Sequence, residues 1–302
     1  MPVITPPYLK PGDTIGMICP SGYMPFDKAQ KCIDVLQQWG FKVQVGKTLG
    51  NQNNYFSGTD EERLNDLQTM LDNENIKAIY CGRGGYGLSR IIDKMDFKKF
   101  VQHPKWIIGY SDITLLHAHI YSNYNIASLH APMAAAFNEI DESKEYINSI
   151  YDSLIGRHQT YKVASHHLNR NGICKGELVG GNLALLAHII GTKSDINTKN
   201  KILFIEDIGE YKYNIDRMLL QLKRAGKLDE LAGLIVGSFT EIKDTTIPFG
   251  QDLKEIILDK VREYNYPVCF DFPVGHVTEN YALKIGMFYN LIAGNEVILE
   301  ET

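Results

Sequence analysis

The feature of this sequence that most restricts its fold is the regular alternation of strand-like and helix-like segments in its first half. Short runs of strand length lie at 13–19, 41–45, 76–81 and 105–108. Segments with apolar residues at helical spacing follow them, at 27–39, 59–71, 88–92 and from 111 onward. Strands that alternate with helices form a parallel, doubly wound sheet, and such sheets bind ligands beyond the carboxyl ends of their strands. We therefore expect an α/β domain with a site at that edge.

The second half keeps the α/β character but indicates more antiparallel pairing, since its last segment, 282–299, alternates like a hairpin. Between the halves, residues 156–172 are irregular and basic, which is typical of a linker. A chain of 302 residues suggests two domains of about 150 residues each. We expect an N-terminal doubly wound domain at 1–156, a linker at 157–172 and a C-terminal mixed, β-rich α/β domain at 173–302.

The composition, 44% hydrophobic and 22% charged, is that of an ordinary soluble protein. A net charge of -5 gives no general attraction to nucleic acid or anionic lipid, so neither partner is expected. The chain shows no signal peptide and no run near the ~20 apolar residues of a membrane span, which favours a cytoplasmic location. Its five cysteines are widely spaced without a Cys-x-x-Cys pair, which indicates reduced core residues and no zinc site. No metal or cofactor is expected.

A candidate nucleophile lies where the fourth strand becomes a helix. The run 105–108 ends in Gly109-Tyr110-Ser111-Asp112 and continues directly into apolar residues at helical spacing. A side chain on such a turn projects beyond the sheet edge, beside the unpaired first N–H groups of the helix, which can stabilise an anion. On this spacing alone, however, such a serine is more often a helix N-cap than a nucleophile.

A serine hydroxyl needs a base, and the base needs a carboxylate that orients it. Of the nine histidines, His276 is the one that follows a strand within a Gly-His loop, and Glu206 is the first residue past the apolar run 202–205. Taken alone, Glu206 has the plainer interpretation of a solvated strand end, and His276 that of a loop histidine. The glycine-rich turn 82–87 suggests phosphate binding but matches neither a dinucleotide fingerprint nor a P-loop.

Five segments in this order resemble the LD-carboxypeptidase family of serine peptidases, which includes muramoyltetrapeptide carboxypeptidases and the microcin C self-immunity hydrolases. The resemblance covers nearly the whole chain. It implies a flavodoxin-like N-terminal domain joined to a β-rich C-terminal domain, with the site between them. The matching segments are Gly82-Arg83-Gly84-Gly85-Tyr86-Gly87, Gly109-Tyr110-Ser111-Asp112-Ile113-Thr114, Gly180-Gly181-Asn182-Leu183, Phe204-Ile205-Glu206-Asp207 and Gly275-His276.

The resemblance implies that Ser111 is the nucleophile, Glu206 the acid of the triad and His276 the base. In that mechanism the histidine takes the serine proton, the carboxylate stabilises the imidazolium, and an acyl-enzyme forms. By position, we expect the oxyanion to be stabilised by the backbone N–H of Asp112 and that of Gly84 or Gly85.

The substrate implied by the resemblance is a murein tetrapeptide, from which the terminal D-alanine is released. Arg83 is the nearest fixed cation for a terminal carboxylate, although it could equally brace its own loop. Gly180 and Asn182 are further expected substrate-binding residues, and a homodimer is the expected assembly.

Two alternatives stay open at this point. A microcin-immunity-type hydrolase would cut an acyl-sulfamoyl or acyl-phosphoramidate nucleotide and would stack the adenine on an aromatic side chain of the second domain. A non-catalytic ligand-binding protein could keep the same fold, although the intact Ser111, Glu206 and His276 argue against it.

Overall fold

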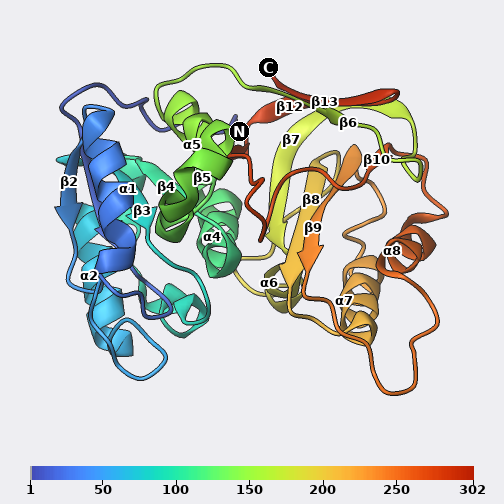
Figure 1. Cartoon of the computed structure of the whole chain (residues 1–302), viewed down its shortest axis with the longest axis horizontal. Helices are drawn as coiled ribbons and strands as arrows, with labels where there is room; N and C mark the ends of the chain where they lie inside the picture. Colours follow the sequence, from blue (N-terminus) through green and yellow to red (C-terminus); the bar gives the residue numbers. More distant parts are fainter. Residues whose placement is uncertain (1) are drawn as a thin grey trace.

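The computed structural model describes residues 2–302, without the side chains of residues 140–143. It contains two sheets that lie side by side, with helices α4 and α6 between them (Figure 1). The first sheet has the order β2-β1-β3-β4-β5-β11, in which β11 alone is antiparallel to its neighbour. Its strands are β1 (Thr14–Ile18), β2 (Lys42–Val45), β3 (Ile76–Cys81), β4 (Trp106–Gly109), β5 (Ser128–His130) and β11 (Leu283–Ile285).

The order 2-1-3-4-5 of the parallel strands is that of a flavodoxin-like, doubly wound sheet, which confirms the fold class. Helices α1 and α5 pack on one face, and α2 and α4 on the other, because successive side chains of each strand point to opposite faces. A capping box formed by Thr59 and Glu62 opens α2. The α-helices of this half are α1 (Asp27–Gln38), α2 (Asp60–Asp72), α3 (Lys98–Gln102), α4 (Thr114–Tyr124) and α5 (Ile140–Leu154).

The second sheet has the order β10-β9-β8-β7-β12-β13-β6 and mixes both pairing modes. β7 to β10 are parallel, whereas β7, β12, β13 and β6 pair antiparallel, as a mixed, β-rich half requires. Its strands are β6 (Thr160–Ala164), β7 (Gly172–Asn182), β8 (Ile202–Ile208), β9 (Gly233–Thr240), β10 (Val268–Cys269), β12 (Phe288–Ala293) and β13 (Glu296–Glu301). The helices are α6 (Leu183–His188), α7 (Lys212–Arg224) and α8 (Leu253–Val261).

Two segments differ from the sequence-based expectation. The segment 157–172, expected as a linker, contains β6, which pairs with β13 and buries Tyr161. The segment 282–299 does contain the hairpin of β12 and β13, but β11 at its start returns to the first sheet and pairs with β5. Both pairings join residues more than 100 positions apart, so local periodicity does not reveal them.

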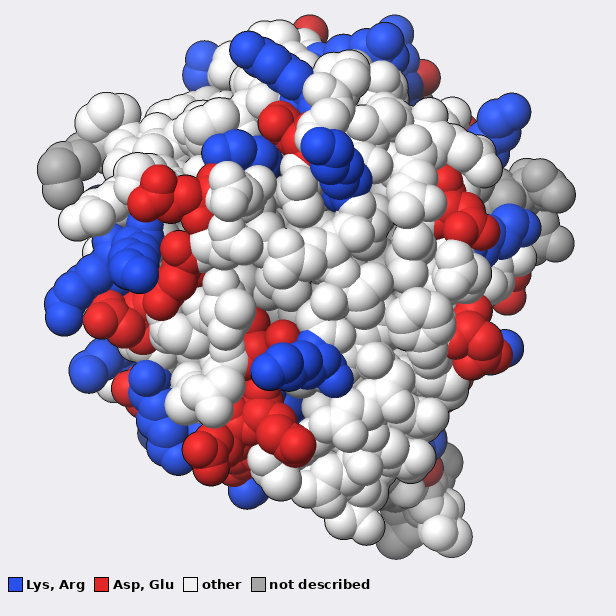
Figure 2. Space-filling model, turned by 90° about the vertical axis from the view of Figure 1, so that its left-hand side faces the viewer, with Lys and Arg blue, Asp and Glu red and all other residues white. Residues whose placement is uncertain are grey.

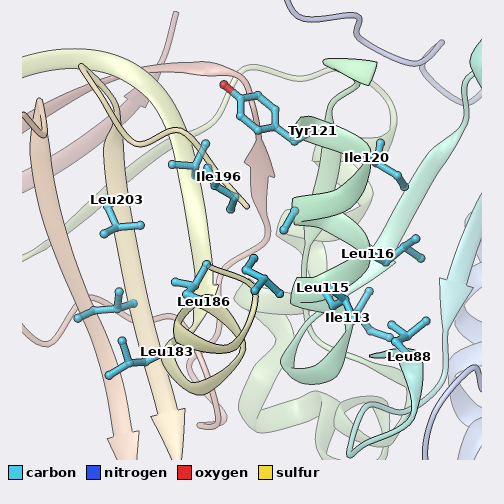
Figure 3. Close-up of a cluster of buried hydrophobic side chains, with 14 of the residues drawn as sticks. Leu88, Ile113, Leu115, Leu116, Ile120, Tyr121, Leu183, Leu186, Ile196 and Leu203 are labelled. Carbon is cyan, nitrogen blue, oxygen red and sulfur yellow. The ribbon is translucent and has the colours of Figure 1, made fainter. Parts of the chain in front are cut away.

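A shared hydrophobic core joins the two halves. Leu115 and Leu116 of α4 and Leu183 and Leu186 of α6 belong to one buried cluster, which Figure 3 shows between the two sheets. Because this packing is apolar and continuous, the carboxyl-end turns of the first sheet are held against the second half.

On the face drawn in Figure 2, basic and acidic side chains lie among one another around a wide uncharged area. This face shows no extended patch of one sign. Within residues 2–302, no helix is long and apolar enough to cross a membrane.

Candidate active site

Ser111 lies on the strand-to-helix turn that the sequence predicts. β4 ends at Gly109, a 3₁₀ turn spans Ser111–Ile113, and α4 begins at Thr114. Ser111 has φ of 63°, a left-handed conformation that non-glycine residues seldom adopt and that is common at functional sites. Tyr110 and Ile113 hold the N-cap positions, and neither caps through its side chain. The N-cap interpretation of Ser111 is therefore wrong.

The glycine-rich turn after β3 lies directly against this serine. A methyl group on Gly84 would lie 2.9 Å from Cβ of Ser111 and 3.2 Å from the backbone nitrogen of Asp112, so only glycine fits without movement. The Gly84 carbonyl accepts a hydrogen bond of 2.9 Å from the N–H of Gly22, after β1. The residues expected to supply oxyanion donors thus surround Ser111.

Glu206 and His276 form a short hydrogen bond. Nδ1 of His276 lies 2.6 Å from Oε2 of Glu206, whose side chain is fully buried, while that of His276 is 14% exposed. An ionised carboxylate only accepts, so Nδ1 carries the proton, and Nε2 is left with a lone pair that can act as a base. Gly275 permits this approach, because at φ of 119° a methyl group there would lie 2.8 Å from Oε2 of Glu206.

Glu206 does not follow its strand, as the sequence suggested, but lies within β8, which continues to Ile208. The register between β8 and β9 shifts between Ile205 and Asp207, which marks a β-bulge at Glu206. Bulges re-aim side chains and are frequent beside active sites. The apolar run therefore located the carboxylate correctly, although not the end of the strand.

Ser111 and His276 line one cavity of about 670 Å³, a volume typical of small-ligand sites. Its lining residues come from the turns after β1, β3, β4 and β5 of the first sheet and from Ile208 and His276 of the second half. Two charged side chains line it, Arg83 and Lys28, and no Asp or Glu whose side chain the structure describes does so. Its other lining side chains are mostly apolar and include Met24, Pro25, Met133, Ala135, Ala136 and Ile208.

Both cavity cations are exposed, and neither is in an ion pair with any described carboxylate. Nη1 of Arg83 donates a 2.6 Å hydrogen bond to the carbonyl of Tyr23, so Arg83 does brace the facing loop. A guanidinium has five N–H donors, and this bond uses one of them. Sequence reasoning missed Lys28, although its position at the start of the helix after β1 was a usable signal.

The buried rings near the site are held neutral. Nε2–H of His117 donates to the Gly109 carbonyl at 2.8 Å, and burial lowers the pKa of His117 to about 4. Burial also lowers the pKa of His130, whose ring lies 5.6 Å from that of Tyr110. Tyr110 in turn packs against His276 at 4.8 Å. His117 and His130 are therefore packing residues.

Among the described residues that line the cavity, neither Gly180 nor Asn182 appears, and their expected contact with substrate stays a prediction. The amide of Asn182 donates to Asp207 at 2.9 Å, and its backbone N–H donates to Oγ1 of Thr114 at 3.1 Å. A methyl group on Gly180 would collide with the carbonyl of Phe204. These residues therefore join β7 to β8 and to α4, which is a structural role.

The cysteines are all unpaired. Across the part of the chain that the structure describes, no group of three or more His, Cys, Asp or Glu is arranged to hold a metal ion. The chemistry available in the cavity is that of a hydroxyl, an imidazole with its carboxylate, and backbone N–H groups.

Comparison with known proteins agrees with this geometry. A family model described as the LD-carboxypeptidase N-terminal domain matches residues 15–131, and its C-terminal counterpart matches residues 175–291. The probable murein peptide carboxypeptidase of Bacillus subtilis (strain 168) is 37% identical over 284 residues, which cover 93% of this chain and 89% of that protein.

Solved structures show the same fold. The muramoyltetrapeptide carboxypeptidase from Oxalobacter formigenes matches with a TM-score of 0.87 at 29% identity, over 95% of this chain and 98% of that one. The microcin C7 self immunity protein MccF, in complex with aspartyl sulfamoyl adenosine, matches with a TM-score of 0.86 at 24% identity, over 99% of this chain and 98% of that one. At that identity the second likeness concerns the fold alone. On the family match and the 37% identity, this chain belongs to the LD-carboxypeptidase family.

Proposed function

We propose that this protein is a serine-type LD-carboxypeptidase that releases the terminal D-alanine from a murein tetrapeptide. The bond cut joins the L-centre of the third residue to D-alanine. The observation that carries the proposal is the 2.6 Å bond between His276 and Glu206 on a cavity that Ser111 also lines. The names of the Bacillus subtilis and Oxalobacter formigenes relatives support the substrate class.

In the proposed reaction, Nε2 of His276 takes the hydroxyl proton of Ser111 as Oγ attacks the peptide carbonyl. Glu206 stabilises the resulting imidazolium. The tetrahedral intermediate breaks the C–N bond, the imidazolium proton passes to the leaving amine of D-alanine, and a tripeptide ester of Ser111 remains. Water, deprotonated by His276, then hydrolyses this ester and restores the serine.

The oxyanion of each tetrahedral intermediate needs preorganised donors. We assign these to the backbone N–H of Asp112 and that of Gly84 or Gly85, and the loss of one such donor typically costs about 3 kcal/mol in the barrier. The contact of Gly84 with Ser111 supports this assignment.

Arg83 is the proposed partner of the substrate's terminal carboxylate, and Lys28 adds a second positive charge to the cavity. A cavity with two cations and no acidic lining suits an anionic peptide. The bond from Arg83 to Tyr23 fits the same role, because it fixes the guanidinium while leaving other N–H groups for a ligand.

The test is to incubate wild type and Ser111→Ala with a muropeptide tetrapeptide, a pentapeptide and a processed microcin, and to follow the products by mass. Wild type should release D-alanine from the tetrapeptide, and Ser111→Ala should not. Ser122→Ala is the matched control, since Ser122 is exposed on α4 away from the cavity. If wild type cleaved none of the three substrates, the enzyme proposal would be wrong.

One observation keeps the microcin-type hydrolase as a second candidate. Tyr211 and Tyr213, three and five residues after the cavity residue Ile208, are both exposed, and their rings stack at 5.5 Å. Such rings could hold an adenine. In that case Tyr211→Ala should reduce cleavage of the microcin while leaving tetrapeptide cleavage unchanged.

We further propose two domains, at 1–156 and 173–302. The connecting segment 157–172 adds β6 to the second sheet, and β11 of the second domain pairs with the first sheet. We also propose a cytoplasmic location and a homodimer. The unpaired cysteines support a reducing compartment. The exposed side chains of Ile173 and Phe288, with Lys175 and Asn290 between them on β7 and β12, are the surface that we propose for contact with a second copy. Cell fractionation and sedimentation equilibrium test the last two points.

A further inference from the structure

The carboxylate of Asp112, the residue after the proposed nucleophile, receives donors from two other turns. Its side chain is buried, and Oδ2 accepts from Oγ of Ser21 at 2.6 Å and from the N–H of Leu88 at 3.0 Å. Ser21 follows β1, and Leu88 follows the glycine-rich turn after β3. One anion thus ties the turns of three neighbouring strands together.

A buried cation performs the complementary task. The guanidinium of Arg63, from α2, is fully buried, and its Nη1 donates to the carbonyls of Pro20 at 2.7 Å and Gly87 at 3.0 Å. Its Nη2 forms an ion pair with Asp60. Arg63 therefore bonds the acceptor groups of the same two turns whose donor groups bond Asp112.

The two charges meet at one peptide group. The carbonyl of Gly87 and the N–H of Leu88 belong to the same peptide unit, so Arg63 holds its oxygen while Asp112 holds its nitrogen. Gly87 has φ of 152°, and a methyl group there would lie 2.6 Å from Nη1 of Arg63. A peptide unit held at both ends cannot rotate, and this one closes the glycine-rich turn that contains Gly84.

Burial raises the pKa of Asp112, and the donors from Leu88 and Ser21 together with the charge of Arg63 oppose that shift. A buried charge without hydrogen-bond partners would destabilise the fold. Asp112 and Arg63 therefore each depend on their hydrogen bonds to the turns after β1 and β3. This arrangement is rigid and directly beneath Ser111.

We propose that Asp112 and Arg63 are positioning residues that clamp the Gly87–Leu88 peptide and thereby keep the backbone N–H of Gly84 or Gly85 aimed at the oxyanion. The inference rests on the proposed function for its catalytic consequence. The side chains of Asp112 and Arg63 act through the turn and touch no substrate atom.

The first experiment measures kcat and KM for D-alanine release in Asp112→Asn, Arg63→Lys and a matched control, Arg90→Gln. Arg90 also pairs with Asp60, but its exposed side chain bonds neither the Pro20 nor the Gly87 carbonyl, and its backbone N–H, which donates to the Gly87 carbonyl at 3.2 Å, is kept in the variant. Both clamp variants should lower kcat about 100-fold, the usual effect of one lost oxyanion donor, with KM changed less than threefold. Arg90→Gln should stay within twofold of wild type. Clamp variants with kcat within threefold of wild type would overturn the inference.

The second measurement separates positioning from general structural support. A peptide boronate, which forms a tetrahedral adduct on a serine, should bind Asp112→Asn about 100-fold more weakly, in parallel with kcat. A merely structural role would instead lower Tm and the fraction of protein that the boronate titrates, with kcat per titrated site unchanged. Ser21→Ala removes one donor and should give an intermediate effect, about tenfold, even if Asp112→Asn does not fold.

A substrate-free readout keeps this inference distinct from the proposed function. Amide hydrogen exchange at Leu88 should be at least tenfold faster in Asp112→Asn or Ser21→Ala than in wild type, and unchanged in Arg90→Gln. If wild type cleaved no tetrapeptide while Leu88 exchange responded in this way, the function would be wrong and the clamp would stand. Unchanged exchange at Leu88 in both Asp112→Asn and Ser21→Ala would overturn the clamp.

Discussion

The two halves of the molecule contribute to the cavity in different ways. The first half supplies backbone, in three turns that Asp112, Arg63 and close glycine contacts bind to one another. The second half supplies an ionisable pair, His276 and Glu206, joined by one hydrogen bond. The turns of the first half are joined by several hydrogen bonds, whereas one hydrogen bond links the imidazole of His276 to its carboxylate, with the ring of Tyr110 packed beside it. We therefore expect sharper losses from single substitutions on the second side.

The largest effect is expected from a substitution that weakens the hydrogen bond between His276 and Glu206. Glu206→Gln should lower kcat for D-alanine release about 10³- to 10⁴-fold, because a neutral amide stabilises neither the required tautomer nor the imidazolium. Glu230→Gln is the control, since Glu230 is exposed and pairs only with Lys199 among the described residues. Steady-state kinetics on the tetrapeptide measures both. A loss below tenfold for Glu206→Gln would contradict the assignment of the triad acid.

The second-largest effect is expected from a substitution that displaces His276 but keeps its imidazole. In Gly275→Ala the new methyl group would lie 2.4 Å from Oγ of Ser238 and 2.8 Å from Oε2 of Glu206, so kcat should fall about 100-fold and Tm by several degrees. Gly250→Ala isolates the backbone term, because Gly250 also has positive φ but no atom within 4 Å of the added methyl. Equal kcat in the two variants would show that the contact with Glu206 has no role.

Substitution of Arg83 or Lys28, the cavity cations of the first half, should lower activity less than disruption of the His276–Glu206 pair does. Arg83→Ala should lower kcat/KM more than tenfold, mainly through KM, because it removes a charge-assisted contact to the terminal carboxylate. Lys28→Gln should cost about threefold, and Lys31→Gln, on the same helix but outside the cavity, should cost nothing. A loss of tenfold or less for Arg83→Ala would leave Arg83 only its bond to Tyr23.

Substitution of His117, which lies under the turn of Ser111, should affect activity least. Its expected effect is on the stability of the fold. Burial lowers the folded pKa of His117 to about 4, below the value of 6.5 expected when unfolded. Above pH ~6.5 its contribution to stability is complete, and it is lost as pH falls toward 4, because the unfolded state takes up the proton first. As pH falls from ~6.5 to about 4, wild type should therefore lose about 3 kcal/mol more unfolding free energy than His117→Gln does.

Urea unfolding at a series of pH values measures this difference. Glutamine can still donate to the Gly109 carbonyl, so the variant should fold. His167→Gln, in an exposed loop, should keep the wild-type slope. If His117→Gln lost stability as steeply as wild type on acidification, the neutral buried state of His117 would be wrong.

The same contrast explains what the sequence could reveal. The turn at Ser111 was predictable because strand, turn and helix follow one another without a break. Glu206 was found as the polar end of an apolar run, but its place inside β8 depends on a bulge against β9, which leaves no local signal. Their assignment to one site came from the family resemblance and not from spacing.

Long-range pairings were the part that sequence could not supply. β6 exists because β13 pairs with it, and β11 because β5 does. In the same way, no sequence pattern connects Asp112 with Arg63 of α2. Their shared peptide unit becomes visible only when β1, β3 and β4 lie together.

In the proposed mechanism Ser111 attacks the substrate, His276 is its base and Glu206 is the carboxylate that stabilises the imidazolium. Its most direct test is to mix wild type with tetrapeptide, stop the reaction with acid during the first turnover, and determine the mass of the protein and of its proteolytic fragments. We predict an added tripeptide acyl group on the fragment that contains Ser111, together with one released D-alanine per acyl group. An acyl group on another residue, or D-alanine release by Ser111→Ala at the wild-type rate, would contradict the account.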